Sequence, residues 1–335
     1  MAIKEEITTK LASKRLLSAL KAVSDETRVR ILHILSFGAF SVNDVVEILE
    51  MGQSRISRHL KILTEAGLIQ TRREGSLVYS YLPESSSKSE QGTSFPFFID
   101  LTNLILSYKE DLPERERDQK KVSLVLETRE KKSKGFFDRV AGDWETLQEE
   151  ILHPKVYRSW ILENLPNQSK EILDLGCGPG GLIPYLLPKA KRILGVDSSQ
   201  KMIEAAKSAF GNNESVRLLT AQLESLPLED NSCDAVVGSM VLHHISHPPA
   251  VIYEVSRVLK ADGIFCLVDL VKHNQEMMRD NFADLWLGFE PDLLESWLTN
   301  AGFIIESISE IQTDSIFKIL TIKAKKKGGH HVHSN

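Results

Sequence analysis

Residues 171–181 read EILDLGCGPGG, which is a short β-rich run followed by a glycine-rich turn. Gly176, Gly178 and Gly181 satisfy the spacing G-x-G-x-x-G, which occurs where a buried strand turns tightly into a helix and holds part of a nucleotide. The motif alone is a weak signal. Its meaning depends on the segments around it and on the side chains within it.

Four more β-rich runs follow this turn, and helical stretches such as 199–210 and 248–260 separate them. Such alternation predicts a parallel α/β sheet with helices on both faces. After the last run, the sequence predicts one more helix and two more strands before residue 325. The four runs are 192–197, 216–220, 233–239 and 263–269.

The composition is ordinary for a globular protein that is long enough for two domains. Of 335 residues, 42% are hydrophobic and 26% are charged, which excludes wholesale disorder. No uncharged apolar run approaches the roughly 18 residues that span a bilayer, and the acidic start MAIKEEITTK lacks the apolar core of an export signal. Three cysteines (Cys177, Cys233 and Cys266) are too few for a disulfide scaffold. We therefore expect a cytoplasmic protein with no membrane partner.

The charge is distributed unevenly along the chain. Residues 1–85 carry 12 Lys or Arg against 10 Asp or Glu, and residues 86–135 carry 10 against 9. Residues 136–335 carry 19 Lys or Arg against 27 Asp or Glu, so this part accounts for the negative formal net charge of −5 of the whole chain. A mildly basic N-terminal part with clustered arginines is compatible with a nucleic-acid contact.

The N-terminal part has the pattern of a helix-turn-helix followed by a hairpin. Two helices are expected at 42–50 and 53–66, and Ser41 with Asp44 resembles a capping box that begins the first. Gly52 can cap the second helix. Alternating residues on both sides of Glu74 and Gly75 predict two strands and a tight turn.

The second of these helices has an apolar back and a polar, basic front. Ile56, Leu60 and Leu63 share one side of a helical wheel. Arginine reaches guanine edges, serine reaches bases or phosphates, and lysine neutralises phosphate, so the front is typical of a helix in the major groove. An ordinary solvated surface helix has the same two faces, and the pattern alone leaves this alternative open. The candidate DNA-binding residues are Gln53, Ser54, Arg55, Ser57, Arg58, Lys61 and, on the hairpin, Arg72 and Arg73.

The order of these segments resembles the ArsR-type winged-helix family over residues 10–85. The stretches that carry the resemblance are ETRVRILHIL, VVEILEMGQSRISRHLKILTEAGLI and RREGSLVYSYL. It implies a recognition helix at 53–66, a wing at 72–79 and a homodimer built by the outer helices. Metal-sensing members carry paired cysteines before the recognition helix, but residues 40–44 read FSVND. Hydroxyl and amide oxygens bind soft metal ions poorly, so we expect no metal sensing there.

Two residues of the glycine-rich turn favour S-adenosylmethionine over a nicotinamide dinucleotide. Asp174 precedes the first glycine by two positions, where its carboxylate would repel a pyrophosphate and attract the ammonium group of a methionine moiety. Pro179 removes an amide where a phosphate would need a donor. Asp197, at the end of the next β-rich run, suits the ribose of either cofactor.

Residues 216–245 and 257–270, with the glycine-rich turn, resemble class I S-adenosylmethionine-dependent methyltransferases. Among these they are most similar to the small-molecule branch that includes the ubiquinone/menaquinone-biosynthesis enzymes, over about residues 135–310. The resemblance implies a Rossmann-like, mixed, seven-stranded sheet. Gln222 stands where an acid usually binds the adenine amino group, and its amide oxygen can still accept that hydrogen bond. Trp144 is a candidate lid residue, with helix packing as the alternative. The implied cofactor-binding residues are Asp174, Gly176, Gly178, Gly180, Asp197, Ser198, Met202, Gln222, Leu223, Ser239 and Trp144.

Methyl transfer from a sulfonium requires alignment and the exclusion of water, and it requires a base only when the acceptor loses a proton. His243 and His244 follow the fourth β-rich run, where acceptors lie in this fold, and are the candidate catalytic residues. The alternative is that they are loop or helix-start residues with no catalytic task. The cysteines are expected to be small core residues rather than arsenite ligands, and no metal site is predicted.

The sequence thus predicts four segments and leaves two functions open. The first function is an S-adenosylmethionine-dependent methyltransferase that acts on a small-molecule acceptor and yields S-adenosylhomocysteine as product. This enzyme would be fused to an ArsR-like dimeric regulator that binds duplex DNA. The second is a transcription regulator that senses either cofactor form through a catalytically silent domain. The segments are a winged helix-turn-helix at 10–85, dimerisation or linker helices at 86–135, the methyltransferase domain at 136–325 and a disordered tail at 326–335.

Overall fold

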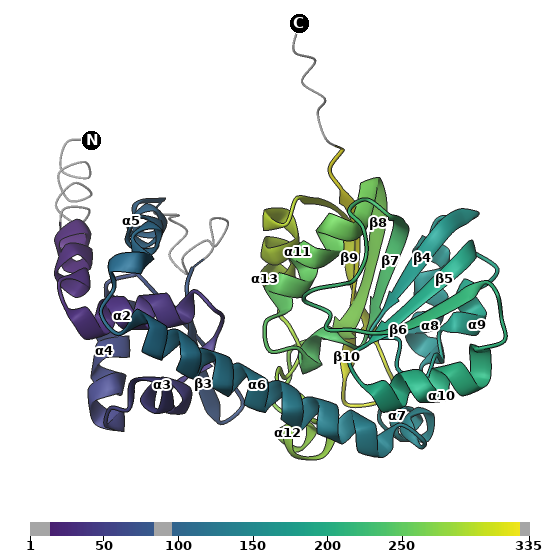
Figure 1. Cartoon of the computed structure of the whole chain (residues 1–335), viewed down its shortest axis with the longest axis horizontal. Helices are drawn as coiled ribbons and strands as arrows, with labels where there is room; N and C mark the ends of the chain where they lie inside the picture. Colours follow the sequence, from purple (N-terminus) through teal and green to yellow (C-terminus); the bar gives the residue numbers. More distant parts are fainter. Residues whose placement is uncertain (1–13, 84–95, 329–335) are drawn as a thin grey trace, which may run out of the picture. The chain divides into compact units, whose positions relative to one another are not determined.

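The computed structural model describes residues 14–83 and 96–328 (Figure 1). The chain divides into two compact units, Met1–Arg129 and Glu130–Asn335. Within the described ranges, no helix is both long enough and apolar enough to cross a bilayer. Of the predicted tail, Lys326 is the last residue of a strand, and 329–335 lie outside the described residues.

The first unit is a small helical domain with a three-stranded antiparallel sheet in the order β1-β3-β2. Its predicted local signals are confirmed: Ser41 and Asp44 form a capping box, and α4 begins after Gly52. The tight turn lies between β2 and β3, as expected. A helix at 14–23 precedes the named elements, which are α2 (Glu26–Leu35), β1 (Phe40–Ser41), α3 (Val42–Leu49), α4 (Gln53–Glu65), β2 (Gln70–Glu74), β3 (Leu77–Tyr81), α5 (Pro96–Ser107) and η1 (Lys109–Asp111).

The charge-rich segment after residue 113 is a long helix, α6 (Arg115–Val140), and not an extended linker. Its first half packs on the first unit, because Val122 and Val125 join the same apolar cluster as Phe98 of α5. Two ion pairs add to this contact. Both carboxylate oxygens of Asp118 accept hydrogen bonds from Arg30 of α2 at 2.7 Å, and Arg129 donates to Asp44, the capping residue of α3, at 2.7 Å.

The second unit confirms the predicted mixed sheet of seven strands, in the order β6-β5-β4-β7-β8-β10-β9. The first five of these strands pair in parallel, and β10 is antiparallel to both β8 and β9. The elements are α7 (Trp144–Ile151), α8 (Lys155–Asn164), β4 (Ser169–Leu175), α9 (Ile183–Leu186), β5 (Ala190–Asp197), α10 (Gln200–Phe210), β6 (Val216–Thr220), β7 (Cys233–Ser239), η2 (Leu242–His244), α11 (Pro248–Val258), β8 (Leu259–Leu270), α12 (Met277–Phe282), α13 (Pro291–Asn300), β9 (Phe303–Gln312) and β10 (Lys318–Lys326).

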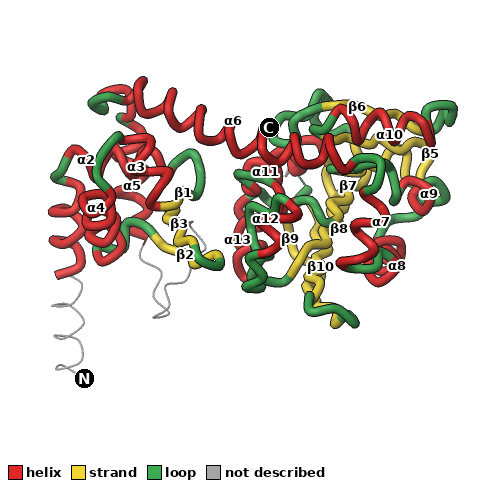
Figure 2. Tube along the Cα trace, turned by 90° about the horizontal axis from the view of Figure 1, so that it is seen from below, coloured by secondary structure: helices red, strands yellow, loops and turns green. Residues whose placement is uncertain are grey.

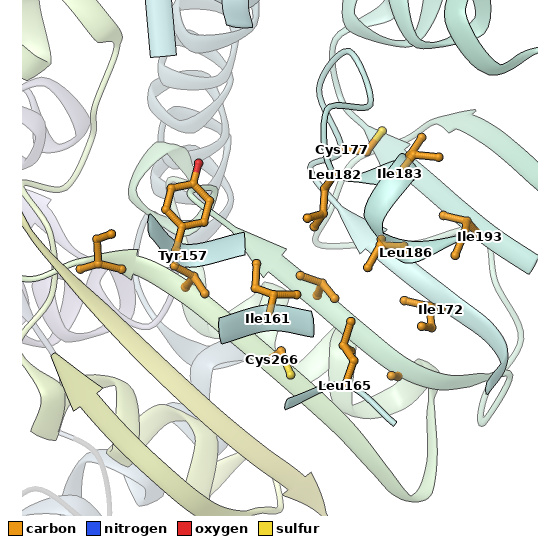
Figure 3. Packing of buried hydrophobic residues seen from close by; sticks show 14 of the residues in the cluster. Tyr157, Ile161, Leu165, Ile172, Cys177, Leu182, Ile183, Leu186, Ile193 and Cys266 are labelled. Atoms are coloured by element: carbon orange, nitrogen blue, oxygen red, sulfur yellow. The ribbon is translucent and has the colours of Figure 1, made fainter. Parts of the chain in front are cut away.

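Helices cover both faces of this sheet, with α8 and α9 on one side and α11 and α13 on the other (Figure 2). Side chains of α8, among them Tyr157 and Ile161, lie over the sheet in one buried cluster with Ile172 of β4 and Cys266 of β8 (Figure 3). All three cysteines are buried and unpaired, as expected for small core residues.

The strand order predicts a ligand-binding position at the end of β4. The chain extends the sheet from β4 through β5 and β6 on one side and through β7 and β8 on the other. In such sheets the loops leave the carboxyl ends of the two central strands in opposite directions, and ligands bind between them. The glycine-rich turn directly follows β4, so it lies at this position.

We expect Asp118→Ala to lower the free energy of unfolding of the N-terminal unit by about 3 kcal/mol, because Arg30 would keep a largely buried charge without its partner. Differential scanning calorimetry of the full chain measures this in the transition of that unit. Glu116→Ala, an exposed acid on the same helix, is the matched control and should change little. Equal effects of the two substitutions would show that the buried pair contributes no stability.

Candidate functional site

The backbone of the glycine-rich turn is held by β5. The amides of Gly176 and Cys177 both donate to the carbonyl oxygen of Val196, at 2.8 and 3.0 Å, and the amide of Gly178 donates to Asp197 Oδ2 at 2.9 Å. Gly180 donates to the carbonyl of Cys177, and Pro179 has no amide hydrogen. Every amide from 176 to 180 is therefore already engaged within the protein.

Gly176 is required by its surroundings as well as by its backbone. Its φ is +68°, and a Cβ there would lie 2.3 Å from Cγ2 of Val241. A side chain would have both an unfavourable backbone conformation and a clash with a buried residue. The glycine thus allows the turn to pass closely under the loop that follows β7.

Asp174, the last but one residue of β4, is a buried carboxylate with an unsatisfied oxygen. Its side chain is 2% exposed, and Oδ2 has no hydrogen-bond partner among the described residues. Burial, with Asp197 nearby, raises the pKa of Asp174 to about 7. A buried unpaired carboxylate is costly, and a cation beside it would remove the cost.

Asp197 ends β5 and orders the next loop. Its Oδ1 accepts from the amide of Ser199 at 2.8 Å, while Oδ2 holds Gly178. Burial raises the pKa of Asp197 although these hydrogen bonds oppose the shift. The hydroxyl of Ser199 accepts from the amide of Met202, which caps α10, and donates to Asp138 of α6 at 2.6 Å.

The other predicted cofactor residues lie at or just after the carboxyl ends of neighbouring strands. Ser198 follows β5 and is half-buried, and Met202 of α10 is fully buried. Gln222 is exposed and Leu223 buried on the loop after β6. Ser239 ends β7, and its hydroxyl is hydrogen-bonded to that of Tyr157. The strand order β6-β5-β4-β7 therefore brings these four strand ends together in one row.

Trp144 lies against the glycine-rich turn. Its indole Cδ1 and Nε1 are 3.8 Å from the position that a Cβ of Gly178 would occupy. The ring of Phe137, at the end of α6, packs edge-on against it with centroids 5.2 Å apart. Phe137 in turn packs edge-on against His244 at 4.7 Å. One aromatic ring thus separates Trp144 from the predicted catalytic histidines.

His243 and His244 belong to a buried ionic cluster. His243 Nδ1 lies 2.6 Å from Asp269 Oδ1 at the end of β8, and its Nε2 lies 3.9 Å from Asp284 Oδ1. His244 Nδ1 lies 3.6 Å from the same Asp284 oxygen. Arg279 contributes positive charge at the edge of the cluster. Burial lowers the pKa of the neighbouring His273 to about 4, so this imidazole is uncharged at neutral pH.

The two histidines have opposite protonation tendencies. Burial alone would lower the pKa of His243, but the carboxylates of Asp269 and Asp284 outweigh it and raise that pKa. Burial and the neighbouring His243 lower the pKa of His244 well below its ordinary value. At neutral pH, His243 therefore holds its proton between two carboxylates and His244 is uncharged.

On the first unit, the structure gathers most of the predicted DNA-binding residues on one exposed face. Ile56, Leu60 and Leu63 are buried under α4, as the helical wheel predicts. The exposed face carries Gln53, Ser54, Arg55, Ser57, Arg58 and Lys61.

The two hairpin arginines differ from each other. Arg73 is exposed, and its Nε donates to the carbonyl of Gly75 in the turn. Arg72 instead points inward: its side chain is 10% exposed and pairs with buried Glu74 at 2.6 Å. Arg72 therefore belongs to the packing of the hairpin and not to the exposed basic face.

The sequence did not single out Phe137, Asp138, Tyr157, Asp269 or Asp284. Asp269 had a detectable signal, because it is an acid at the end of a β-rich run, where ligands bind in this fold. The others lie on helices or in a loop far along the chain, and only the tertiary fold brings them to the site.

Comparison with protein families finds two matches. Residues 25–71 match the bacterial regulatory protein, arsR family, and residues 173–267 match a methyltransferase domain. These segments contain α4 and the strand ends described above. The two resemblances inferred from sequence motifs are confirmed.

Individual relatives agree with this division. An uncharacterized 37.1 kDa protein in transposon TN4556 of Streptomyces fradiae is 37% identical over 111 residues, which cover 32% of this chain. The chain spans only 32% of that protein's length. Demethylmenaquinone methyltransferase of Symbiobacterium thermophilum is 27% identical over 187 residues, covering 52% of this chain and 73% of the relative.

A solved structure shows the same fold in the second unit. A chain in the complex between the Haloferax volcanii Trm112 methyltransferase activator and a methyltransferase matches with a TM-score of 0.50 and 18% identity. The match covers 57% of this chain and 97% of the other. The protein therefore combines an ArsR-family helix-turn-helix at residues 25–71 with a class I methyltransferase domain.

Proposed function

We propose that this protein transfers the methyl group of S-adenosylmethionine to a small-molecule acceptor and binds duplex DNA through α4. The observation that carries the first part is the unsatisfied oxygen of buried Asp174 beside a turn whose amides are all engaged. A carboxylate without a partner favours a ligand with a positive charge. S-adenosylmethionine brings both an ammonium group and a sulfonium.

The same turn is a poor phosphate site. A dinucleotide is held by backbone amides at a helix start, and the helix after this turn, α9, has only four residues. The amides from 176 to 180 already donate to protein oxygens or are absent. Binding a pyrophosphate here would require those hydrogen bonds to break next to the buried Asp174.

The remaining cofactor contacts follow from the row of strand ends. Asp174 and the glycines Gly176, Gly178 and Gly180 surround the methionine end. Each oxygen of Asp197 accepts one backbone amide and retains lone-pair capacity for the ribose hydroxyls. On the loops after β5, β6 and β7, the adenine and the rest of the cofactor contact Ser198, Met202, Gln222, Leu223 and Ser239, and Trp144 covers the turn.

The cofactor supplies the activated methyl group, so the protein's task is to align the acceptor and exclude water. Trp144 and Phe137 provide an apolar cover next to the turn. His243 holds its proton at neutral pH and is therefore not a base in the resting protein. We propose methyl transfer to an acceptor that needs no deprotonation by these histidines.

We propose a homodimer for the DNA-binding unit. Leu16, Leu17 and Leu20 on the helix at 14–23, and Leu104 and Tyr108 at the end of α5, are all more than 40% exposed. Exposed apolar side chains on neighbouring outer helices suit a partner copy, and paired recognition helices read half-sites at a fixed spacing.

A regulator that senses the cofactor is the second candidate, and α6 favours it. Arg129 of this helix pairs with the capping residue of α3, while Phe137 packs on Trp144 and Asp138 accepts from Ser199 beside Asp197. One helix thus carries contacts to elements of the DNA-binding unit and to the cofactor site. Cofactor binding that moves the end of α6 would bias the winged helix, and linkage would make the effect reciprocal.

We expect cofactor affinity to rise with pH up to about pH 7 and then to level off. Asp174 holds a proton below its pKa of about 7, and an ammonium ligand beside it requires the ionised form, so binding at lower pH must release that proton. The Asp174→Asn protein should bind S-adenosylhomocysteine about 1–3 kcal/mol more weakly and lose this part of the pH dependence. Calorimetric titration of the wild-type and Asp174→Asn proteins between about pH 5.5 and about pH 8.5 measures the affinity for S-adenosylhomocysteine and its dependence on pH.

The same substitution should stabilise the unliganded protein at high pH. Because the folded pKa lies above the ordinary value of 3.8, ionised Asp174 destabilises the fold, and this cost grows between about pH 4 and pH 7. At pH 8, Asp174→Asn should therefore raise the free energy of unfolding by about 1–3 kcal/mol. Asp314→Asn, an exposed acid, is the control. A destabilised Asp174→Asn protein would contradict the cationic-ligand assignment.

For DNA binding, we expect two arginines to act differently. Arg58→Ala should relax the preference for particular bases, because a bidentate hydrogen-bond donor on α4 is lost. Arg73→Ala should weaken binding to DNA of every sequence and lower, by about one, the slope of the logarithm of affinity against the logarithm of salt concentration. Mobility shifts with genomic fragments at several salt concentrations measure this, with Lys207→Ala as an exposed cationic control on the other unit. Absence of any shift at low salt would refute the DNA-binding proposal.

The enzymatic proposal predicts a methylated product. The full-length protein is incubated with S-adenosylmethionine that carries an isotopically labelled methyl group and with a metabolite extract, and mass spectrometry identifies small molecules that gain the label. The Asp174→Asn protein is the matched control. Label in at least one metabolite supports methyl transfer, whereas cofactor binding with no labelled product favours the sensor.

A further inference from the structure

The ionic cluster beside the cofactor site has no task in the proposed reaction. We propose that His243, His244 and Asp284 bind a divalent transition-metal ion of the zinc class. One ligand atom from each residue lies within 4.8 Å of the other two. Metal–ligand bonds of about 2.0–2.1 Å place tetrahedral donors about 3.3 Å apart. Asp284 Oδ1 lies 3.9 Å from His243 Nε2 and 3.6 Å from His244 Nδ1, so only a small contraction is needed. His244 Nδ1 also lies 3.4 Å from the carbonyl oxygen of Ala283, and the ion would replace this contact.

The surroundings of Asp284 support a cation site independently of these distances. Its side chain is fully buried, and neither carboxylate oxygen accepts a hydrogen bond from the described part of the chain. Buried carboxylates are normally satisfied by donors or by a metal ion. Both oxygens of Asp284 therefore lack the hydrogen bonds that a purely structural carboxylate would have.

His243 is oriented as a metal ligand. Its Nδ1 is bound to Asp269, which leaves Nε2 on the side of Asp284. An ion bound at Nε2 would displace the proton that this nitrogen carries in the metal-free protein. Asp269 is itself fixed by the amides of Leu242 and Leu270, at 3.0 and 2.8 Å. A carboxylate that holds the second nitrogen of a histidine is the usual support of a histidine–metal bond.

The backbone also holds the two ligand loops together. The amides of Leu285 and Trp286 both donate to the carbonyl of His243, and the indole of Trp286 donates to the carbonyl of Ile245 at 2.7 Å. Ala283, next to Asp284, has a φ of +59°, an unfavourable conformation for a residue with a side chain. The fold thus accepts local strain at the position that directs Asp284 toward the histidines.

The donor set defines the class of ion. Two imidazoles and one carboxylate suit zinc and its neighbours, whereas calcium and magnesium prefer oxygen ligands throughout. Three protein ligands leave one position open for water or for an oxygen or nitrogen atom of a ligand. No metal site was expected from the sequence, in which Asp284 lies 40 residues beyond His244 and no short spacing links them.

The test uses the full-length protein with His330, His331 and His333 replaced by alanine, so that tail histidines cannot bind the ion. After treatment with a chelator, the protein is titrated with Co²⁺, and Zn²⁺ then competes for the site. We expect one equivalent of Co²⁺ with the intense visible absorption of a tetrahedral or five-coordinate site, and its loss on addition of Zn²⁺. Binding is read directly, so the result does not depend on methyl transfer.

Asp284→Asn and His244→Gln should each weaken Co²⁺ binding at least tenfold, and Asp269→Asn, which contacts no ion, should weaken it by about 10–100-fold. His247→Gln, a half-buried histidine of the same loop outside the cluster, should leave it unchanged. Circular dichroism checks that each variant is folded. Because three residues of the cluster are substituted separately, the test remains possible if one variant does not fold. No Co²⁺ or Zn²⁺ binding by the parent protein, or equal affinity in folded Asp284→Asn and His244→Gln, would overturn the proposal.

Discussion

The second unit depends on the placement of a buried, unpaired carboxylate at the end of a central parallel strand. Asp174 is the last but one residue of β4, and burial together with the nearby Asp197 of β5 raises its pKa to about 7. The amides of the turn donate hydrogen bonds to β5 or within the turn itself, and one oxygen of Asp174 has no hydrogen-bond partner among the described residues. We propose that a cationic ligand supplies the missing charge, so that this one residue favours S-adenosylmethionine among the cofactors that this common fold accommodates.

Helix α6 runs from the first unit into the second. A charge-rich helix is usually solvated, but this one buries Asp118 against Arg30 and presents Arg129 to the cap of α3. Its last turns carry Phe137 and Asp138, which contact Trp144 and Ser199. The same helix therefore contacts α3 in the first unit and residues beside the glycine-rich turn in the second.

Features that depend on neighbouring residues were predictable from the sequence. The capping box of Ser41 and Asp44, the apolar back of α4 and the tight turn after β4 follow from local hydrogen bonding and periodicity, and the structure has all of them. Features that depend on the tertiary fold were not. The alternation of a strand places Arg72 and Glu74 on one face of the hairpin, but nothing local in the sequence indicates that this face is buried. Nor does anything local indicate that Asp284 meets His243 across 41 residues. The glycine motif lies between these cases, because its spacing fits two cofactors. Asp174 and Pro179 favour one of them from the sequence, and the hydrogen bonds of the amides in the turn add to this preference.

Isothermal titration calorimetry of the wild-type protein with S-adenosylhomocysteine, S-adenosylmethionine and NAD tests this account most directly. The account predicts that both sulfur-containing ligands bind at one site per chain with low-micromolar or tighter affinity, and that NAD gives no binding heat. Tight binding of NAD together with no binding of either S-adenosyl compound would contradict it, because the unpaired Asp174 would then not select a cationic ligand.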